Sequence, residues 1–254
     1  MIDLHAHVLP DIDDGPKTEE ESLNLLQAMQ HEGISAITCS PHYMPGAYEP
    51  SKQEILQRIN QLQPQIPEVR LLPGAEVYLE HTSLERVKAG FVFTLGDLGT
   101  HLLVELPMGQ LPLYTWQALS NLRDGHIIPI LAHPERNPAL MTNRNELNRI
   151  RELGVLFQMD AASITGDNGP KVQRWSRNLL DQDLVDFLAT DSHSLRRRPP
   201  KLQKAMAVAR GWGWDLTPLA RENPAVILGE EEKLQSVRRI KGKTVFQKLA
   251  LKFR

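Results

Sequence analysis

The sequence predicts a single α/β domain in which a parallel sheet closes into a barrel, followed by a basic C-terminal extension. About seven short apolar segments typical of strands alternate with segments of helical spacing. That alternation indicates a parallel sheet, and so many repeats in one domain favour a barrel. Polar side chains that can bind metal ions follow the apolar segments, where the loops of such barrels build the active site. We therefore expect a barrel at residues 1–229 and a basic tail at 230–254.

The first half of the chain shows the alternation clearly. We expect strands at 1–7, 34–39 and 69–72, and helices at 18–32, 53–62 and, less regularly, 84–89. Thr18 can cap the first helix with Glu21 at the capping-box position, and Gly33 ends it. Pro41 cannot donate a backbone hydrogen bond, so the second strand ends there and His42 lies in the following loop.

The second half repeats the same unit. We expect strands at 101–107, 127–132, 155–159 and 184–189, and helices at 116–123, 143–153 and 171–180. Gly125 and Gly154 follow two of these helices, in keeping with the preference for glycine after a helix end.

Composition excludes several classes of protein. The formal net charge of -2 gives no general attraction to nucleic acid, so we expect no nucleic-acid partner. Cys39 is the only cysteine, which rules out an intrachain disulfide and fits a cytoplasmic protein. No apolar run approaches the roughly 20 residues of a membrane span. Cys39 also lacks the Cys-x5-Arg loop of thiol phosphatases, so we expect it in the core.

His5 and His7 are the first candidate ligands. Residues i and i+2 of a strand point the same way, so the two imidazoles are expected side by side. The turn at 11–15 adds carboxylates directly afterwards. Taken alone, the pair is better explained as two unrelated histidines on an edge strand, because short motifs are weak signals, and only the later segments reverse this interpretation.

Other candidate ligands also close apolar runs, and together they favour a metal site. Glu105 is the strongest single case, because a carboxylate inside an apolar strand is costly unless it is paired or binds a metal. Imidazole and carboxylate ligands without paired thiols suit manganese, zinc or iron. The strand-end candidates after the first strand are His42, Glu76, Glu105, His133, Asp191 and His193. The histidines expected not to bind metal are His31, His81, His101 and His126.

Two arginines are candidate phosphate ligands. Arg136 follows His133 closely, and three arginines at 196–198 follow His193. Guanidinium groups match phosphate oxygens in a bidentate manner. A solvated basic turn explains at least one of the three, and we expect Arg198, directly before two prolines, to be the one at the site. Closely spaced metal ions activate water and stabilise the oxygens of a displacement at phosphorus, which points to phosphate-ester hydrolysis.

These motifs resemble the PHP superfamily, and most closely its metal-dependent protein-tyrosine phosphatases of bacterial capsule and exopolysaccharide clusters. The motifs are Asp3-Leu-His-Ala-His7, Leu9-Pro-Asp-Ile-Asp-Asp-Gly15, Pro41-His-Tyr43, Gly74-Ala-Glu-Val-Tyr78, Val104-Glu-Leu-Pro107, Ala132-His-Pro-Glu-Arg136 and Thr190-Asp-Ser-His193. One departure is Asp160-Ala-Ala-Ser163, where many members have an Asn-Ala type of sequence.

The resemblance implies a distorted (β/α)7 barrel with three metal ions, expected to be Mn²⁺, with iron or zinc as alternatives. It implies one ion at His5, His7, Glu76 and Asp191, and a second at Glu76, Glu105 and His133. It implies a third at His42, His193 and an aspartate of the first turn, for which we choose Asp14 and keep Asp13 as an alternative. Arg136 and Arg198 would hold the phosphoryl group.

The implied activity is hydrolysis of protein phosphotyrosine, with the tail of a membrane-bound tyrosine autokinase that controls polysaccharide export as the implied substrate. A phosphatase for a small phosphomonoester such as histidinol phosphate is the nearest alternative. A nuclease is disfavoured because no basic groove with interleaved aromatics is evident, and a non-catalytic scaffold because it needs no buried ligand set. The sequence leaves the oligomeric state open.

The C-terminal tail has its own character. Residues 233–254 contain eight basic residues and no acidic ones, interspersed with apolar residues. A solvated chain end explains this composition. The alternative is an amphipathic segment that contacts anionic lipid or an acidic partner at the membrane.

Overall fold

The computed structural model describes residues 1–230 and 234–240, and it has an α/β fold built on parallel strands. Besides a short two-stranded sheet near the C-terminus, one sheet has the order β1-β2-β4, and a second has the order β3-β5-β6-β7-β8-β9. The strands of the first sheet are β1 (Ile2–Ala6), β2 (Ala36–Cys39) and β4 (Arg70–Pro73). Those of the second are β3 (His42–Tyr43), β5 (Glu76–Tyr78), β6 (His101–Glu105), β7 (Ile128–Ala132), β8 (Leu156–Asp160) and β9 (Phe187–Ala189).

Two short breaks carry the chain from the first sheet into the second. Pro41 separates β2 from β3, as expected from its missing N–H, and Gly74 separates β4 from β5. The expectation that His42 lies in a loop is wrong, because His42 begins β3 and pairs with Glu76 of β5. A Cβ atom on Gly74 would lie 2.4 Å from the Thr38 side chain, so the close approach of the two chain segments there requires glycine.

The first strand also lies beside the end of the last one. Ala6 forms a parallel bridge with Ser192, and the backbone N–H of His7 donates to the Ser192 carbonyl at 2.8 Å. The Asp191 N–H donates to the His5 carbonyl at 2.9 Å. The chain segments that carry the first and last candidate ligands are therefore neighbours.

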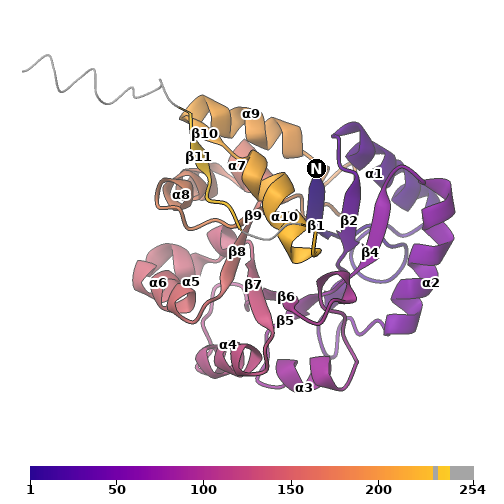
Figure 1. The fold of residues 1–254 in the computed structure, drawn as a ribbon, viewed down its shortest axis with the longest axis horizontal. Helices are drawn as coiled ribbons and strands as arrows, with labels where there is room; N and C mark the ends of the chain where they lie inside the picture. The colour runs from indigo at the N-terminus through magenta and orange to yellow at the C-terminus, as the bar shows by residue number, and fades with distance from the viewer. Residues whose placement is uncertain (231–233, 241–254) are drawn as a thin grey trace, which may run out of the picture.

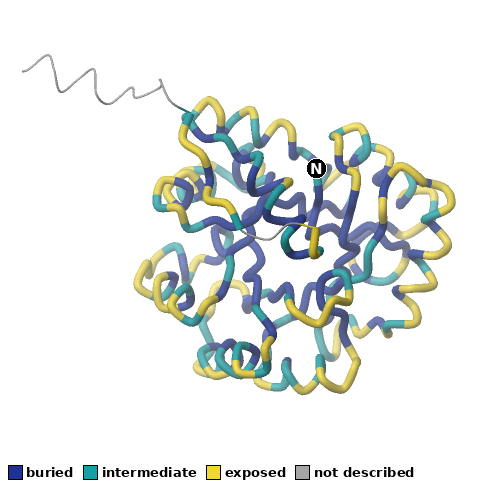
Figure 2. The backbone as a smooth tube through the Cα atoms, in the orientation of Figure 1, coloured by how far each residue is buried: buried dark blue, intermediate teal, exposed yellow. Residues whose placement is uncertain are grey.

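Helices surround the strands, and Figure 1 shows them on the outside with the strands at the centre. The strands at the centre are mostly buried and the outer helix faces are exposed, as Figure 2 shows. The helices are α1 (Glu19–His31), α2 (Lys52–Leu62), α3 (Ser83–Lys88), α4 (Tyr114–Asp124), α5 (Pro138–Thr142), α6 (Arg144–Glu152), α7 (Ala161–Thr165), α8 (Pro170–Asp181), α9 (Leu202–Trp212) and α10 (Asn223–Ile227). Short 3₁₀ segments lie at Gln63–Gln65, Leu95–Asp97 and Pro134–Arg136, and a π-helical segment at Pro218–Glu222.

The start of α1 shows how local sequence sets an element. The Thr18 hydroxyl accepts the Glu21 N–H at 3.2 Å, which is the predicted cap. The Glu21 carboxylate accepts from the Lys17 N–H at 2.7 Å, one residue before the position that a capping box requires. The expected capping box is therefore wrong in this detail, while Gly33 adopts a φ of 78° and ends the helix as predicted.

The chain after residue 200 closes one end of the strand array. Ala225 and Ile227 of α10 pack with Ile2, Leu4 and Phe187, which lie at or near the beginnings of β1 and β9. Figure 1 shows α10 in front of β1. These contacts at the amino end of β1 and β9 are apolar, whereas the candidate metal ligands lie at the opposite, carboxyl end.

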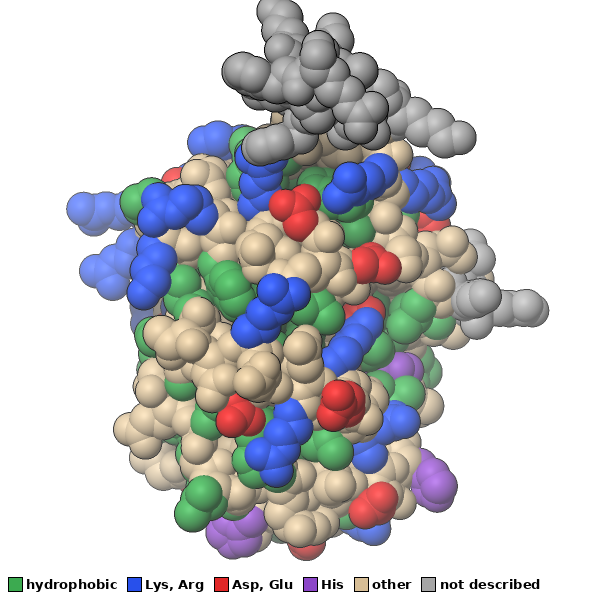
Figure 3. All heavy atoms as spheres, turned by 90° about the vertical axis from the view of Figure 1, so that its left-hand side faces the viewer, with side chains coloured by type: hydrophobic (Ala, Val, Ile, Leu, Met, Phe, Trp, Pro, Cys, Tyr) green, Lys and Arg blue, Asp and Glu red, His purple; other side chains and the backbone are tan. Residues whose placement is uncertain are grey.

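Much of the expected basic tail, residues 231–233 and 241–254, lies outside the described residues. In the described part, β11 (Arg238–Arg239) pairs antiparallel with β10 (Trp214–Asp215), and Val237 is buried. Figure 3 shows the face that includes α8, where Lys and Arg side chains are spread over the upper half. No helix among the described residues combines the length and apolar character needed to cross a membrane.

Candidate metal centre

The imidazoles of His5 and His7 meet at the end of β1, as the alternation of a strand predicts. Their Nε2 atoms lie 3.1 Å apart, and both side chains are almost completely buried. Two ring nitrogens this close must be placed by other groups, since at most one of them can donate a hydrogen to the other.

Gln158 sets the tautomer of His5. The His5 Nδ1 lies 2.8 Å from the Gln158 Oε1, and the Gln158 amide nitrogen donates to Asp160 Oδ1 at 3.0 Å. Because the amide nitrogen is used by Asp160, the amide oxygen faces His5 and accepts its Nδ1–H. The lone pair of His5 therefore lies on Nε2, which points into the centre.

Asp13 does the same for His7. The His7 Nδ1 lies 2.6 Å from Asp13 Oδ2, so a carboxylate holds the ring N–H and leaves the Nε2 lone pair pointing inward. The Gly15 N–H donates to the other Asp13 oxygen at 2.8 Å. A Cβ atom on residue 15 would lie 2.8 Å from the His7 carbonyl, so this turn requires glycine.

Glu76, the first residue of β5, is the point on which the imidazoles converge. Its Oε2 lies 3.2 Å from His5 Nε2, 3.3 Å from His7 Nε2 and 3.0 Å from His42 Nδ1. This buried oxygen nevertheless has no hydrogen-bond partner in the described part of the chain. Burial raises the pKa of Glu76, but the neighbouring imidazoles outweigh burial and hold the pKa well below its usual range.

His133 and Glu105 lie on the other oxygen of Glu76. The His133 Nε2 is 3.0 Å from Glu76 Oε1 and 3.7 Å from Glu105 Oε1. Burial lowers the pKa of His133, yet Asp160 and Glu76 raise it to about 10. His133 directly follows β7 and has a φ of 34°. Left-handed backbone at a non-glycine residue is costly and is typical of functional sites.

Asp191 completes this side of the centre. Its Oδ1 lies 3.4 Å from His5 Nε2 and 3.5 Å from His7 Nε2. Asp191 has a φ of 51°, again just beyond a strand end. Burial raises its pKa, but His5, His193 and Arg136 lower it far below the usual value.

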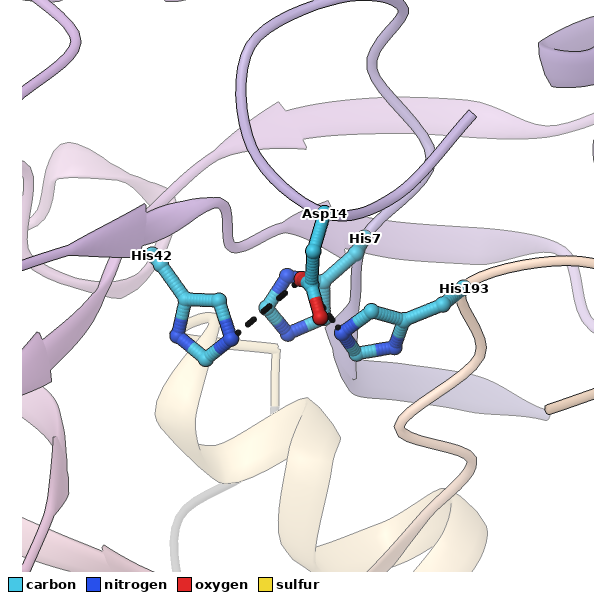
Figure 4. A group of neighbouring side chains, drawn as sticks. All are labelled: His7, Asp14, His42 and His193. Atoms are coloured by element: carbon cyan, nitrogen blue, oxygen red, sulfur yellow. Dashed lines mark ion pairs between the residues drawn. The ribbon is translucent and has the colours of Figure 1, made fainter. Parts of the chain in front are cut away.

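Asp14, His42 and His193 form a further group, shown with His7 in Figure 4. Asp14 Oδ1 lies 3.0 Å from His193 Nε2 and 3.5 Å from His42 Nε2. The His193 Nδ1 donates to the Asp191 carbonyl at 2.9 Å, so its Nε2 lone pair faces Asp14. Of the two aspartates left open by the sequence, Asp14 faces this group, whereas Asp13 contacts His7.

The structure thus brings all nine predicted ligands into one connected cluster. Three overlapping sets have ligand atoms close enough to share an ion: His7, Asp14, His42 and His193; His5, His7 and Glu76; and His42, Glu76 and Glu105. The donor chemistry fits divalent cations, because imidazole nitrogens and carboxylate oxygens point at common positions.

Arg136 and Arg198 border the cluster through Asp191. An Nη1 of each lies close to Asp191 Oδ2, at 2.5 Å for Arg136 and 3.1 Å for Arg198. Arg136 also contacts Asp160 Oδ2 at 2.9 Å, and Arg198 contacts Asp14 Oδ2 at 2.9 Å. Both arginines line or adjoin the cluster, and a cavity of about 310 Å³ lies beside them.

The remaining histidines and the cysteine lie elsewhere. Among the described residues, no set that could share an ion includes His31, His81, His101 or His126. Cys39 is buried in the core, and burial raises its pKa to about 12, which suits neither a nucleophile nor a metal ligand.

The sequence analysis did not identify the residues whose hydrogen bonds support the ligands and the segments that carry them. Asp3 is buried, and its carboxylate accepts from Thr190 Oγ1 at 2.6 Å, which ties β1 to the loop after β9. Gln158 and Asp160 share one face of β8, a spacing of two that matches His5 and His7. That spacing was a usable signal, but the expected strand ended at 159 and placed Asp160 in the loop.

Comparisons with known proteins agree with this geometry. A family model described as capsular polysaccharide synthesis, CpsB/CapC, matches residues 1–229. A Staphylococcus aureus protein named putative tyrosine-protein phosphatase CapC is 33% identical over 208 residues, which cover 80% of this chain and 81% of that protein. The tyrosine-protein phosphatase CpsB of Streptococcus pneumoniae is 30% identical over 223 residues, or 84% of this chain and 91% of that protein.

Solved structures give the same result. The chain matches a structure from work on Bacillus subtilis YwqE and Streptococcus pneumoniae CpsB, which are described as unique metal-dependent tyrosine phosphatases. The TM-score is 0.87 at 27% identity, with 93% of this chain and 97% of that chain covered. A β-aspartyl dipeptidase of Fervidobacterium islandicum matches with a TM-score of 0.57 at 11% identity, a likeness of fold alone.

The resemblance expected from the motifs is therefore confirmed, and the chain belongs to the CpsB/CapC family of capsular polysaccharide synthesis proteins.

Proposed function

We propose that this chain is a metal-dependent protein-tyrosine phosphatase that works with Mn²⁺. The observation that carries the proposal is the arrangement around Glu76, where ring N–H groups are held outside and lone pairs converge inside. A centre of this kind is completed by cations and not by hydrogen bonds. Relatives named tyrosine-protein phosphatases support the choice of substrate.

We assign the ligands of three ions to this cluster. His5, His7, Glu76 and Asp191 hold the first ion, and Glu76 is shared with a second ion at Glu105 and His133. His42, His193 and Asp14 hold the third. The distances of 3.0–3.7 Å between the facing ligand atoms support this assignment. Imidazole and carboxylate donors suit manganese, and they are also compatible with iron or zinc.

The bound ions would supply activated water and neutralisation of charge at phosphorus. The chain itself supplies the phosphate-binding groups. Arg136 and Arg198 both reach Asp191 Oδ2, so their guanidinium groups stand on the same side of the centre and can hold phosphoryl oxygens. A tyrosine leaving group has a pKa of about 10 and needs little protonation, so no dedicated general acid is required.

The strand arrangement supports a further structural proposal. We propose that the seven strand positions form one closed (β/α)7 barrel, with β2 and β3, and β4 and β5, as broken strands. The Ala6–Ser192 bridge would close the ring between β1 and β9. Closure would explain why ligands from every part of residues 1–193 share one end.

We propose the phosphotyrosine tail of a membrane-bound tyrosine autokinase as the natural substrate, with the enzyme acting in the cytoplasm. The family description, capsular polysaccharide synthesis, supports a role in capsule or exopolysaccharide production. The direct check is co-purification of the phosphorylated kinase with a catalytically inactive Asp191→Asn variant. Recovery of the kinase only in its phosphorylated form would support this assignment. Failure of the phosphorylated kinase to co-purify with the variant would contradict it.

We also propose that the tail at 230–254 contacts anionic membrane near such a kinase. Exposed arginines on α8, α9 and β11, including Arg174, Arg210 and Arg238, place further positive charge near β11. Truncation after Glu232 is expected to weaken binding to anionic vesicles without changing hydrolysis of a short peptide. Unchanged vesicle and kinase binding would contradict the proposal.

The main test of activity compares two substrates. The protein is stripped of metal, reloaded with Mn²⁺ and assayed on a phosphotyrosine peptide and on histidinol phosphate in parallel. We expect peptide hydrolysis that disappears with chelator and with His133→Ala. Selective hydrolysis of histidinol phosphate would instead identify a phosphatase of small metabolites and overturn the proposed substrate class.

A further inference from the structure

The loop at 194–198 is a tight, ordered turn beside the metal centre. Ser194 and Arg198 form an antiparallel bridge, and the His193 N–H donates to the Arg198 carbonyl at 3.1 Å. The Arg197 N–H donates to the Ser194 hydroxyl at 3.1 Å. These contacts hold the backbone of the turn, so the arginines that project from it have a defined position.

Cations predominate in the cavity that this loop borders. The cavity of about 310 Å³ is lined by five cationic side chains, Arg136, Arg196, Arg197, Arg198 and Lys201, and by three acidic ones, Asp160, Asp167 and Asp191. Most of these charges are already paired. Arg136 and Arg198 contact the acids of the centre, and Lys201 Nζ lies 2.9 Å from Asp167.

Arg196 and Arg197 are the exceptions. Both are exposed, and within residues 1–230 and 234–240 neither forms an ion pair. Both also line a second cavity of about 480 Å³, on the side of Asp14, Lys17 and His193. The two unpaired guanidinium groups therefore border both cavities. The first cavity is also lined by Asp191 and the second by Asp14 and His193, which are proposed metal ligands.

We propose that Arg196 and Arg197 form a second anion-binding subsite, which takes a phosphate or carboxylate group on the same peptide a few residues from the phosphotyrosine being hydrolysed. This inference rests on the proposed phosphatase function and adds a preference for multiply phosphorylated or acidic peptides. The reacting phosphate would lie by Arg136 and Arg198, while the neighbouring anion would meet the unpaired pair in the cavity.

The test uses the Mn²⁺-loaded full chain and three peptides of one sequence. The first carries a single phosphotyrosine with neutral neighbours, the second adds a phosphoserine, and the third adds a glutamate at that same position. The added residue is moved from one to four positions away on either side, since each residue of extended chain spans about 3.3–3.6 Å. Phosphoserine and glutamate arms show whether a phosphate is required or a carboxylate is sufficient.

We expect the best placed second anion to lower KM about tenfold, which corresponds to about 1.4 kcal/mol, with kcat unchanged. Arg196→Ala/Arg197→Ala should remove this preference. Arg174→Ala/Arg177→Ala on α8 is the control. It removes the same amount of charge outside the cavity and should retain the preference for peptides with a second anion. The preference should also weaken between about 0.1 M and 1 M salt, because the Debye length falls from about 10 Å to 3 Å.

Equal KM values for all peptides in the wild-type protein would overturn the subsite. So would a preference that survives in Arg196→Ala/Arg197→Ala. Absence of hydrolysis of the singly phosphorylated peptide is a different result, because it contradicts the proposed phosphatase function itself.

Discussion

The two ends of the strands hold charged groups in two different arrangements. At the amino end, Arg151 of α6 forms a two-pronged ion pair with Asp186, with Nη2 2.8 Å from Oδ1. The Phe157 N–H also donates to Asp186 Oδ2 at 2.8 Å. The hydrogen bonds that Arg151 donates to the Asp186 carboxylate raise the pKa of Arg151. Each charged group contacts one of opposite charge, so the hydrogen bonds of this pair are satisfied within the protein.

At the carboxyl end, several metal-binding atoms converge on one position. The Nε2 atoms of His5 and His7 lie 3.1 Å apart, and Glu76 Oε2 lies among imidazoles without a hydrogen-bond partner in the described residues. Such an arrangement is costly unless something positive is added. The comparison shows that an ion pair between strands does not identify a metal site, whereas several imidazole and carboxylate atoms that converge on common positions do.

The largest expected effect follows from Glu76, which we assign to two of the three proposed ions. Glu76→Gln places an NH₂ group or a neutral oxygen against the imidazoles, so Mn²⁺ content and phosphotyrosine hydrolysis should fall to the level of the chelated protein. Metal analysis and kcat/KM measure both. Glu85→Gln on the exposed face of α3 is the matched control. Full metal content in Glu76→Gln would contradict the assignment.

Arg136→Ala should leave the metal ions bound but reduce kcat by about 10²- to 10³-fold, because a preorganised donor to the phosphoryl oxygens is lost. Parallel measurement of kcat and manganese content separates this effect from metal loss. Arg174→Ala removes an exposed arginine of α8 and serves as the control. A change confined to KM would mean that Arg136 binds substrate without favouring the transition state.

Gln158→Leu should have a smaller effect that falls on metal affinity. Without the amide oxygen, the His5 ring loses the acceptor that holds its Nδ1–H, so Mn²⁺ should bind about 10- to 100-fold more weakly. Titration with Mn²⁺ gives the affinity, and saturating metal should restore most of kcat. Gln57→Leu, at an exposed position of α2, is the control. Unaltered affinity would show that packing alone orients His5.

Asp186→Asn should change stability and not chemistry. Breaking a buried pair costs about 3–5 kcal/mol, and partial exposure here reduces the expected loss to about 2–3 kcal/mol. Urea unfolding measures that loss, while metal content and kcat at 25 °C should match the wild type. Loss of metal in this variant would mean that the two ends of the strands are coupled.

The smallest expected effect concerns His101, remote from the proposed ligands. Burial and then Arg123 lower its pKa to about 4. The unfolded chain therefore binds the proton more tightly, so this stability is present above about pH 6.5 and is lost as pH falls towards 4. Between pH 7.5 and pH 5, His101→Leu should lose about 1 kcal/mol less stability than the wild type. Equal losses in urea unfolding would contradict this prediction.

Local rules predicted the strand ends and the residues that follow them. The strand ending at Cys39 and the one ending at Ala132 end where expected, and the ligands that follow them lie in the centre. The alternation of His5 and His7 and the terminating effect of Pro41 are local properties, so they can be read without tertiary information. The parallel arrangement then brought distant strand ends together.

Contacts between distant segments could not be predicted in the same way. The pairing of His7 with Asp13, which leaves Asp14 to face His42 and His193, depends on the path of the turn around Gly15. The packing of α10 against the start of β1 also depends on the whole array. Asp160 differs from the expected residue type, and its contact with Arg136 appears only when β7 and β8 are paired.

The most direct test of the account is anomalous X-ray scattering at the manganese edge from crystals of the Mn²⁺-loaded protein. The account predicts peaks within ligand distance of His5 and His7, of Glu105 and His133, and of His42 and His193, with Glu76 between the first two. Absence of any peak at His5 and His7 under conditions that support hydrolysis would contradict its central claim.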